Sequence, residues 1–281
     1  MINRQPAKAF SLCKTARSGK TEEKDMQMKN KVCVVTGAAG GIGAALARQF
    51  AAKGAKGIVV ADIQDGPARG VADEVGGKAF IGDMTQETDI QALIAMAEET
   101  YGDIDVFCSN AGIIRLGTEQ ASNDEWQLCW DLHLMAHVYA ARVLAPKMAI
   151  RGDGYLVNTA SAAGLLSHVN SATYTVTKHA AVAFAEWISI AYGDRGVKVS
   201  VLCPQAVKTS MTEGRDQGAA SVDGLITAEY LADCVIASMD TEEFLILPHT
   251  KVTDYMKRKA DNADRWLRGM RKYKAMYPEG I

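Results

Sequence analysis

Short apolar segments alternate along the chain with longer segments in which apolar residues recur every three or four positions. The short segments are rich in Val, Ile and Phe, which predicts β-strands over 32–36, 57–61, 78–81, 104–109, 155–159, 197–203 and 244–247. The longer segments are rich in Ala, Leu, Glu and Lys, which predicts α-helices over 41–53, 67–75, 87–101, 123–150, 171–192 and 227–239. Such alternation is typical of parallel strands joined by right-handed crossovers. We therefore expect an α/β fold, a doubly wound parallel sheet of about seven strands with helices on both faces.

The domain organisation follows from where this alternation begins and ends. No linker rich in Pro, Gly or Ser interrupts it between residues 31 and 250, which predicts a single domain over that range. Residues 1–30 are polar and basic, and we interpret them as a flexible leader, with an organelle transit peptide as the alternative. Residues 251–281 hold apolar residues at helical spacing among many Lys and Arg, which predicts an amphipathic basic helix. We expect it to pack on its own subunit or a neighbour rather than on a membrane or nucleic acid.

Composition narrows the class of protein. The chain has 31 Lys and Arg against 33 Asp and Glu, a formal net charge of -2, and 48% hydrophobic residues. The charge gives no reason to expect nucleic-acid binding, and no apolar stretch approaches the roughly 20 residues that span a bilayer. Six cysteines occur without a CxxC pair, which favours reduced thiols, a cytoplasmic location and no metal site.

A glycine-rich loop lies between the first expected strand and the first expected helix. It reads Thr36-Gly37-Ala38-Ala39-Gly40-Gly41-Ile42-Gly43. Glycines allow a tight turn and a close backbone approach to a pyrophosphate, which the free N–H groups at a helix N-terminus attract. We therefore assign dinucleotide binding to Gly37, Gly41, Ile42 and Gly43, the alternative being a plain strand-to-helix turn.

Two acidic residues follow the next two strands. Asp62 ends the second strand, where a carboxylate can accept hydrogen bonds from ribose hydroxyls and repel a 2'-phosphate, so we predict NAD as the cofactor. The alternative for Asp62 is a solvated residue at a strand end. Asp83, after the third strand, can bind the adenine edge or cap the following turn.

A possible proton-transfer group follows the fifth strand. Ser161 comes directly after that strand, and thirteen residues later Tyr174 precedes Lys178 by one helical turn. A neighbouring ammonium and a positive nicotinamide ring both favour the phenolate of a tyrosine, which can then take the hydroxyl proton during alcohol oxidation. Tyr255 and Lys259 share the same spacing, but they lie beyond the last strand and are interpreted as a solvated helix face.

The glycine loop, Ser161, Tyr174 and Lys178, together with Asn110-Ala111-Gly112 after the fourth strand, resemble the short-chain dehydrogenase/reductase family over roughly residues 30 to 250. The short C-terminal region favours the shorter, single-domain branch. This resemblance implies a Rossmann-type oxidoreductase in which Tyr174 is the catalytic acid/base, Ser161 positions the substrate oxygen, and Lys178 binds the nicotinamide ribose and lowers the tyrosine pKa. It also implies that Asn110, Ala111 and Gly112 line the cofactor site. A homodimer or homotetramer built on the helices at 123–150 and 171–192 is implied as well.

Two positions depart from the family pattern. The family's catalytic Asn, which helps to organise a water in a proton relay, is replaced by His133. That imidazole can bond a water and titrate, or it can be a polar helix residue without catalytic duty. After the sixth strand Gln205 replaces the family's glycine, while Val207 and Thr209 remain placed to contact the carboxamide end of the nicotinamide.

The predicted activity is hydride transfer between NAD and a secondary alcohol or ketone. Residues 211–225 have the composition of a mobile lid. Leu165, Leu166, Val169 and Met211 are candidates for an apolar substrate wall, the alternative being ordinary packing residues. The alternative is a non-catalytic dinucleotide-binding regulatory or scaffold protein, which His133 and Gln205 would suit. The intact set of Ser161, Tyr174 and Lys178 favours the enzyme.

Overall fold

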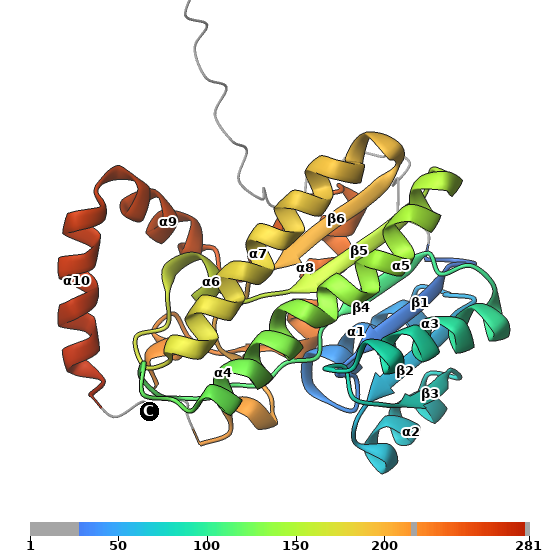
Figure 1. Ribbon diagram of the computed structural model, residues 1–281, viewed down its shortest axis with the longest axis horizontal. Coiled ribbons are helices and arrows are strands. Elements are labelled where there is room, and N and C mark those ends of the chain that lie inside the picture. The colour runs from blue at the N-terminus through green and yellow to red at the C-terminus, as the bar shows by residue number, and fades with distance from the viewer. Residues whose placement is uncertain (1–27, 215–217, 279–281) are drawn as a thin grey trace, which may run out of the picture.

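A parallel sheet of seven strands forms the centre of the molecule (Figure 1). The computed structural model describes residues 28–214 and 218–278. Its strand order is β3-β2-β1-β4-β5-β6-β9, and every pair in it is parallel. The strands are β1 (Val32–Thr36), β2 (Gly57–Asp62), β3 (Lys78–Ile81), β4 (Val106–Ser109), β5 (Gly154–Thr159), β6 (Val197–Leu202) and β9 (Leu245–Ile246). The predicted doubly wound Rossmann-type fold is confirmed.

Helices cover both faces of this sheet. On one face lie α1 (Gly41–Ala52), α2 (Asp65–Glu74) and α8 (Ala228–Asp240), and on the other lie α3 (Glu87–Tyr101), α5 (Ala136–Arg151) and α7 (Ala172–Tyr192). Each layer of helices forms its own apolar core against the sheet. Because both faces of the sheet are buried, its strands read as continuous apolar runs rather than as alternating patterns.

The long helix predicted over 123–150 is interrupted. It consists of α4 (Asn123–Trp130), a π-helical turn over Asp131–Met135, and α5. Ser122 begins α4 with a capping box, in which its Oγ accepts from the Glu125 N–H at 3.2 Å. A π-turn inserts one extra residue into a helix and is frequent at functional sites. Here it contains His133.

Beyond the sheet the chain forms smaller elements. A short helix, α6 (Ala163–Leu166), follows β5, and two short parallel strands, β7 (Val207–Lys208) and β8 (Ile226–Thr227), pair after β6. The sequence did not predict this pair of strands. The C-terminal tail forms two helices instead of the single one predicted, α9 (Lys251–Asp261) and α10 (Ala263–Met276). Asn262 breaks the helix because its backbone is extended and its side chain caps α10 by accepting from the Arg265 N–H at 2.8 Å.

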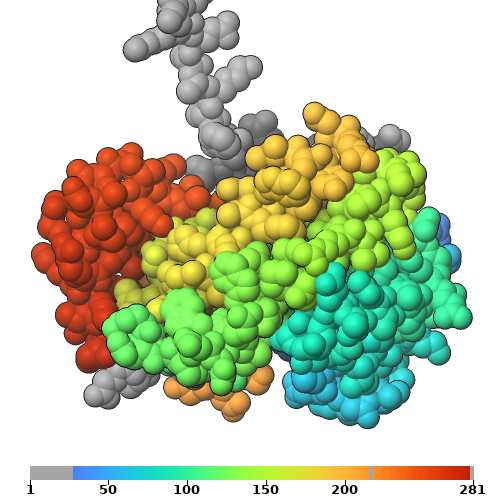
Figure 2. Space-filling model, viewed as in Figure 1, coloured from blue at the N-terminus to red at the C-terminus, as the bar shows by residue number. Residues whose placement is uncertain are grey.

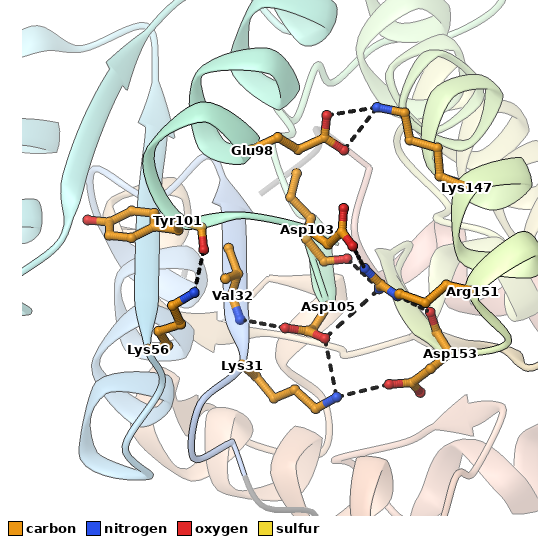
Figure 3. Close-up of polar contacts among 11 residues, drawn as sticks. Lys31, Val32, Lys56, Glu98, Tyr101, Asp103, Asp105, Lys147, Arg151 and Asp153 are labelled. Carbon is orange, nitrogen blue, oxygen red and sulfur yellow. Dashed lines mark hydrogen bonds and ion pairs between the residues drawn. The ribbon is translucent and has the colours of Figure 1, made fainter.

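The amino ends of three central strands are joined by an ion-pair network (Figure 3). Lys31 pairs with Asp105 at 3.2 Å and with Asp153 at 2.9 Å. Arg151 completes it, with Nη2 3.9 Å from Asp105 and Nη1 3.4 Å from Asp103. This network lies at the sheet edge opposite the glycine loop.

Three further features of the chain are the N-terminal leader, possible membrane-spanning helices and possible metal sites. Most of the predicted leader, residues 1–27, lies outside the described part of the chain. Within residues 28–214 and 218–278, no helix has both the length and the apolar character that a membrane crossing needs. The same residues hold no group of three side chains that could bind a metal ion.

Candidate active site

The glycine-rich loop forms a tight cradle between β1 and α1. Gly37 and Gly41 have φ of 63° and 53°, a backbone conformation that favours glycine. A Cβ on Gly37 would lie 2.6 Å from the Cα of Ala111, and one on Gly43 would lie 2.8 Å from Asn110 Nδ2. The loops after β1 and β4 therefore touch, and both sites tolerate only glycine without movement.

A cavity of about 670 Å³ opens beside this loop. Most of the residues predicted to bind the cofactor line it, namely Gly37, Gly41, Ile42, Asp62, Asp83, Asn110, Ala111, Gly112, Tyr174, Lys178, Val207 and Thr209. Gly43 is the exception, because it is buried against Asn110 instead of facing the cavity. Its role is close packing of α1 on the loop, as for the third glycine of dinucleotide-binding folds.

Both predicted acidic residues hold backbone groups at this cavity. Asp62 accepts from the N–H of Ala39 at 3.0 Å and from that of Gln64 at 3.0 Å. Asp83 accepts from the N–H of Thr85 at 2.9 Å, which is the turn cap that was one of its two predicted roles. Asp62 therefore orients the glycine loop, and each carboxylate retains lone pairs toward the cavity.

Asn110 and Thr36 connect the carboxyl ends of three strands. Asn110 Nδ2 donates to the Thr36 carbonyl at 3.0 Å, and its Oδ1 accepts from Thr159 Oγ1 at 3.1 Å. The Thr36 hydroxyl accepts from the N–H groups of Asn110 and Ala111 at 2.9 and 3.1 Å. This role of Thr36 was not predicted, although a hydroxyl at the end of a central strand is visible in the sequence.

Ser161 and Tyr174 lie where the cofactor cavity meets a second cavity of about 370 Å³, since both residues line both. Ser161 is buried, and its Oγ accepts from the Ala163 N–H at 3.1 Å and donates to the Pro204 carbonyl at 3.3 Å. Ser171 caps α7 by accepting from the Tyr174 N–H at 3.1 Å, which fixes Tyr174 in the first turn. The two hydroxyls thus meet at the junction of the cavities.

Lys178 lies one turn further along α7 and is buried. Its Nζ donates to the Thr159 carbonyl at 2.9 Å and lies 5.6 Å from the centre of the Tyr174 ring. Burial lowers the pKa of Lys178 to about 8, so the ammonium remains the major form at neutral pH. The predicted cluster of Ser161, Tyr174 and Lys178 is therefore assembled in space.

The electrostatics of Tyr174 differ from the expectation. Burial raises the pKa of its phenol, and the neighbouring Ser161 side chain offsets only part of that effect. In the protein alone the neutral phenol is favoured, even with the Lys178 ammonium nearby. A positive nicotinamide ring is the remaining charge that can stabilise the phenolate.

His133 is completely buried in the π-turn beside this cluster. Its Nε2 accepts from the Ile113 N–H at 3.2 Å, so the ring proton lies on Nδ1, which is 2.9 Å from Thr177 Oγ1. The Thr177 hydroxyl in turn donates to the Thr173 carbonyl at 2.8 Å. Burial lowers the pKa of the imidazole well below its usual value, and the charge of Lys178 lowers it further. His133 is therefore a neutral bridge with both nitrogens occupied.

Gln205 contacts both cavities at the position where the family has glycine. Its backbone N–H donates to His249 Nδ1 at 3.2 Å. This bond links the loop after β6 to the residues directly before α9. Val207 and Thr209 still line the cofactor cavity.

One prediction about the surroundings of the second cavity needs correction. Tyr255 and Lys259 are not a solvated face, because Tyr255 donates to Asp223 Oδ1 at 3.1 Å and Lys259 donates to the Leu165 carbonyl. Leu166, Val169 and Met211 line this cavity, whereas Leu165 is partly buried and packs against the core, as in the alternative for these residues. The cavity also has lining residues from the tail that were not predicted, namely Tyr255, Arg258, Trp266, Met270 and Tyr273. Their helical spacing was visible, but it does not reveal which surface the helix faces.

Comparisons with known proteins agree with this geometry. The family model described as short chain dehydrogenase matches residues 31–220. A 1-deoxy-11-beta-hydroxypentalenate dehydrogenase from Streptomyces avermitilis is 33% identical over 231 residues, which are 79% of this chain and 85% of that protein. The mitochondrial borneol dehydrogenase of Lavandula x intermedia is 31% identical over 239 residues, 81% of this chain and 90% of that protein.

Among solved structures, a short-chain dehydrogenase/reductase from Burkholderia phymatum in complex with NAD superposes with a TM-score of 0.77 at 26% identity. The match covers 85% of this chain and 95% of that one. The cavity, the glycine cradle and the strand-end carboxylate fit a nicotinamide dinucleotide. This chain, an oxidoreductase by fold and by relatives, belongs to the short-chain dehydrogenase/reductase family.

Proposed function

We propose that the protein is an NAD-dependent oxidoreductase that interconverts a secondary alcohol and its ketone, with Tyr174 as the acid/base. The observation that carries this proposal is the position of Ser161 and Tyr174, whose hydroxyls lie between a cavity that fits the cofactor and a second, largely apolar one. The relatives named for borneol and hydroxypentalenate support an alcohol as substrate.

The proposed step moves one proton and one hydride. NAD, held by the glycine loop and Asp62, would supply the acceptor for the hydride of the carbinol carbon. Ser161 hydrogen-bonds the substrate oxygen and holds it beside Tyr174, which removes the hydroxyl proton as the carbonyl forms. Lys178 carries its ammonium next to the phenol and orients the nicotinamide ribose. In the reverse direction Tyr174 returns the proton to the ketone oxygen.

The experiment that tests this proposal measures NADH production with a panel of secondary alcohols for the unaltered protein and for Tyr174→Phe. We expect Tyr174→Phe to lower kcat by about 10²–10⁴-fold, the contribution typical of general acid–base catalysis. NAD affinity, measured separately by calorimetry, should change little. Unchanged turnover in Tyr174→Phe would contradict the assignment.

The second candidate function is a non-catalytic dinucleotide-binding regulator or scaffold. The raised pKa of Tyr174 and the replacement of the family's Asn by His133 favour it. Binding of NAD without turnover of any alcohol in the panel, in a protein with intact Ser161, Tyr174 and Lys178, would support this candidate. Turnover that requires Tyr174 would exclude it.

We infer further that the protein is a homo-oligomer of the cytoplasm. Large apolar side chains are exposed on α4 and α7, namely Leu128, Trp130, Val176, Trp187 and Ile190. A dimer that buries these helices would remove this surface from water. Four cysteines, Cys33, Cys108, Cys129 and Cys203, are buried thiols, which suits a reducing compartment. Light scattering of the purified protein gives the oligomer number.

A further inference from the structure

The second cavity has walls from several parts of the chain. Ser161 and Tyr174 lie at its inner end, Leu166 and Val169 come from the segment after β5, and residues 218–222 come from the segment before β8. Another wall is the C-terminal tail, which Figure 2 shows as the red lobe at one end of the molecule. The family model ends at residue 220, so this wall lies outside the matched region.

The inner face of α10 is apolar and only partly covered by protein, since Trp266 packs against Leu166 and Val252 while the face also lines the cavity. Trp266, Met270 and Tyr273 follow one another at i, i+4 and i+7, which places them on one face of the helix. All three line the cavity, and no residue of α10 is buried. A helix face that meets a cavity instead of a core remains partly exposed until a ligand covers it. Its chemistry therefore indicates an apolar ligand.

Polar contacts hold the tail across both neighbouring walls. On one side Lys259 donates to the Leu165 carbonyl, and Lys274 donates to that of Val169 at 2.8 Å. On the other side Tyr273 donates to the Ala219 carbonyl at 2.6 Å. These contacts fix the distance between α10 and the inner end of the cavity. The tail thereby limits how large a molecule can bind with its hydroxyl at Tyr174.

A second pair of contacts involves Asp223, whose side chain is buried. Tyr255 donates to it at 3.1 Å, and Lys251 forms an ion pair with it at 3.0 Å. Directly before the tail, His249 Nδ1 accepts at 3.2 Å from the N–H of Gln205, the residue that replaces the family's glycine. The start of the tail is thus connected to the loop that lines the cofactor cavity.

We propose that α9 and α10 are the specificity wall of the substrate cavity, and that the substrate is a bulky secondary alcohol whose hydrocarbon part packs on Trp266 and Met270. The cavity volume of about 370 Å³ lies at the lower end of the range of about 300–1,000 Å³ for small-molecule sites. Among the described residues that line it, Arg258 is the single one with a permanent charge, and its guanidinium lies 5.7 Å from the centre of the Tyr255 ring. This inference rests on the proposed alcohol dehydrogenase activity for the position of the hydroxyl.

The test compares two alcohols that differ in size, so that only the larger one contacts the tail when its hydroxyl is bound at Tyr174. Borneol is bicyclic and would contact the tail wall, whereas 2-propanol bound at Tyr174 is too small to reach it. We expect Trp266→Ala and Met270→Ala each to lower kcat/KM for borneol about tenfold through lost apolar contact, with 2-propanol changed less than about twofold. Leu267→Ala is the matched control, because its side chain lies on the same helix and is 53% exposed. It should change neither value.

Binding is measured in parallel so that failure of the activity and failure of the wall can be told apart. The probe is camphor, the ketone of borneol, titrated into the protein with NADH by calorimetry, and thermal unfolding confirms that each variant is folded. Camphor binding that weakens in Trp266→Ala supports the wall even if no alcohol is oxidised. Two results would overturn the proposed wall. One is an equal loss of kcat/KM for borneol and 2-propanol in the tail variants, and the other is no loss of borneol turnover or camphor affinity in either variant.

Discussion

The carboxylate of Asp62 has two functions at the cofactor cavity, and the balance between them determines cofactor choice. It holds the N–H groups of Ala39 and Gln64, and it faces the place where a ribose would lie. Its negative charge would repel the 2'-phosphate of NADP. We therefore propose a preference for NAD that depends on this one side chain.

Asp62→Ala should reduce the preference for NAD over NADP by at least about tenfold, since hydrogen bonds to a charged group contribute about 1.5–3 kcal/mol. Dissociation constants of both cofactors, measured by calorimetry, give the ratio. Asp83→Ala is the matched control, because Asp83 lines the same cavity but caps a turn. Tighter binding of NADP by the unaltered protein would contradict the role assigned to Asp62.

His133 provides a second prediction at the residue scale. Because its imidazole is neutral and both nitrogens are occupied, we expect His133→Asn to leave the pH profile of kcat unchanged. His133→Leu leaves the Ile113 N–H and Thr177 without this partner and should lower the free energy of unfolding by about 1–3 kcal/mol. The pH profile and urea unfolding of both variants check these outcomes. A profile that moves in His133→Asn would instead show that the imidazole transfers protons.

At the scale of elements, the loop between β1 and α1 gives a paired prediction. A Cβ on Gly43 would collide with Asn110, whereas one on Gly40 meets nothing within 4 Å. We therefore expect Gly43→Ala to lower the free energy of unfolding by about 1–3 kcal/mol through overpacking. Gly40→Ala should change it by less than about 0.5 kcal/mol. Urea unfolding without cofactor measures both values, and equal stabilities would mean that the loop relaxes.

Most of the helices and strands could be predicted because the pattern of buried residues in each one is visible within a short stretch of sequence. Val32–Thr36 and Glu87–Tyr101 have the predicted bounds, since an apolar run and a 3.6-residue period are visible in a short window. The π-turn at Asp131–Met135 could not be predicted, because it depends on the contacts of His133 with Ile113 and α7. The break at Asn262 has a local signal, an Asn that can cap a helix, but the amphipathic pattern continues through it.

The candidate site was predictable to a similar degree and for a similar reason. Strand ends of a parallel sheet meet at one edge, so residues after β1, β2, β4 and β5 could be placed together from their order alone. The tail residues could not be placed at the site, because the helical spacing of Trp266 and Met270 does not specify where α10 packs on the rest of the protein. The raised pKa of Tyr174 was also missed, since burial is a property of the folded structure.

At the scale of the whole molecule, the carboxyl and amino edges of the sheet, where the parallel strands end and begin, differ in function. The carboxyl edge carries the cavities, and the amino edge carries the ion pairs of Lys31, Asp105 and Asp153 (Figure 3). Asp153 also pairs with Lys198 at 3.0 Å, so it ties the segments that begin β1, β5 and β6. We expect this edge to contribute to stability and not to activity.

The titration of Asp153 provides a test of whether the amino edge of the sheet contributes to stability. Burial opposes its ionisation, but hydrogen bonds from Lys31 and Lys198 outweigh that effect and lower its pKa to about 2. Because the folded pKa lies below the unfolded value, its stabilisation is complete above about pH 4 and is lost as the pH falls toward 2. Its side chain is 41% exposed, so solvent screening limits the contribution to about 1 kcal/mol or less.

Asp153→Asn should therefore lower the free energy of unfolding at pH 7 by up to about 1 kcal/mol, and the difference from the unaltered protein should shrink between pH 4 and pH 3. Urea unfolding at each pH measures this difference. The exposed carboxylate of Asp73 on α2 supplies the control, and Asp73→Asn should show no such trend. Both variants should keep the kcat of the unaltered protein, because the ion pairs lie at the edge opposite Tyr174. Loss of kcat in Asp153→Asn with unchanged stability would mean that the two edges are coupled through the strands.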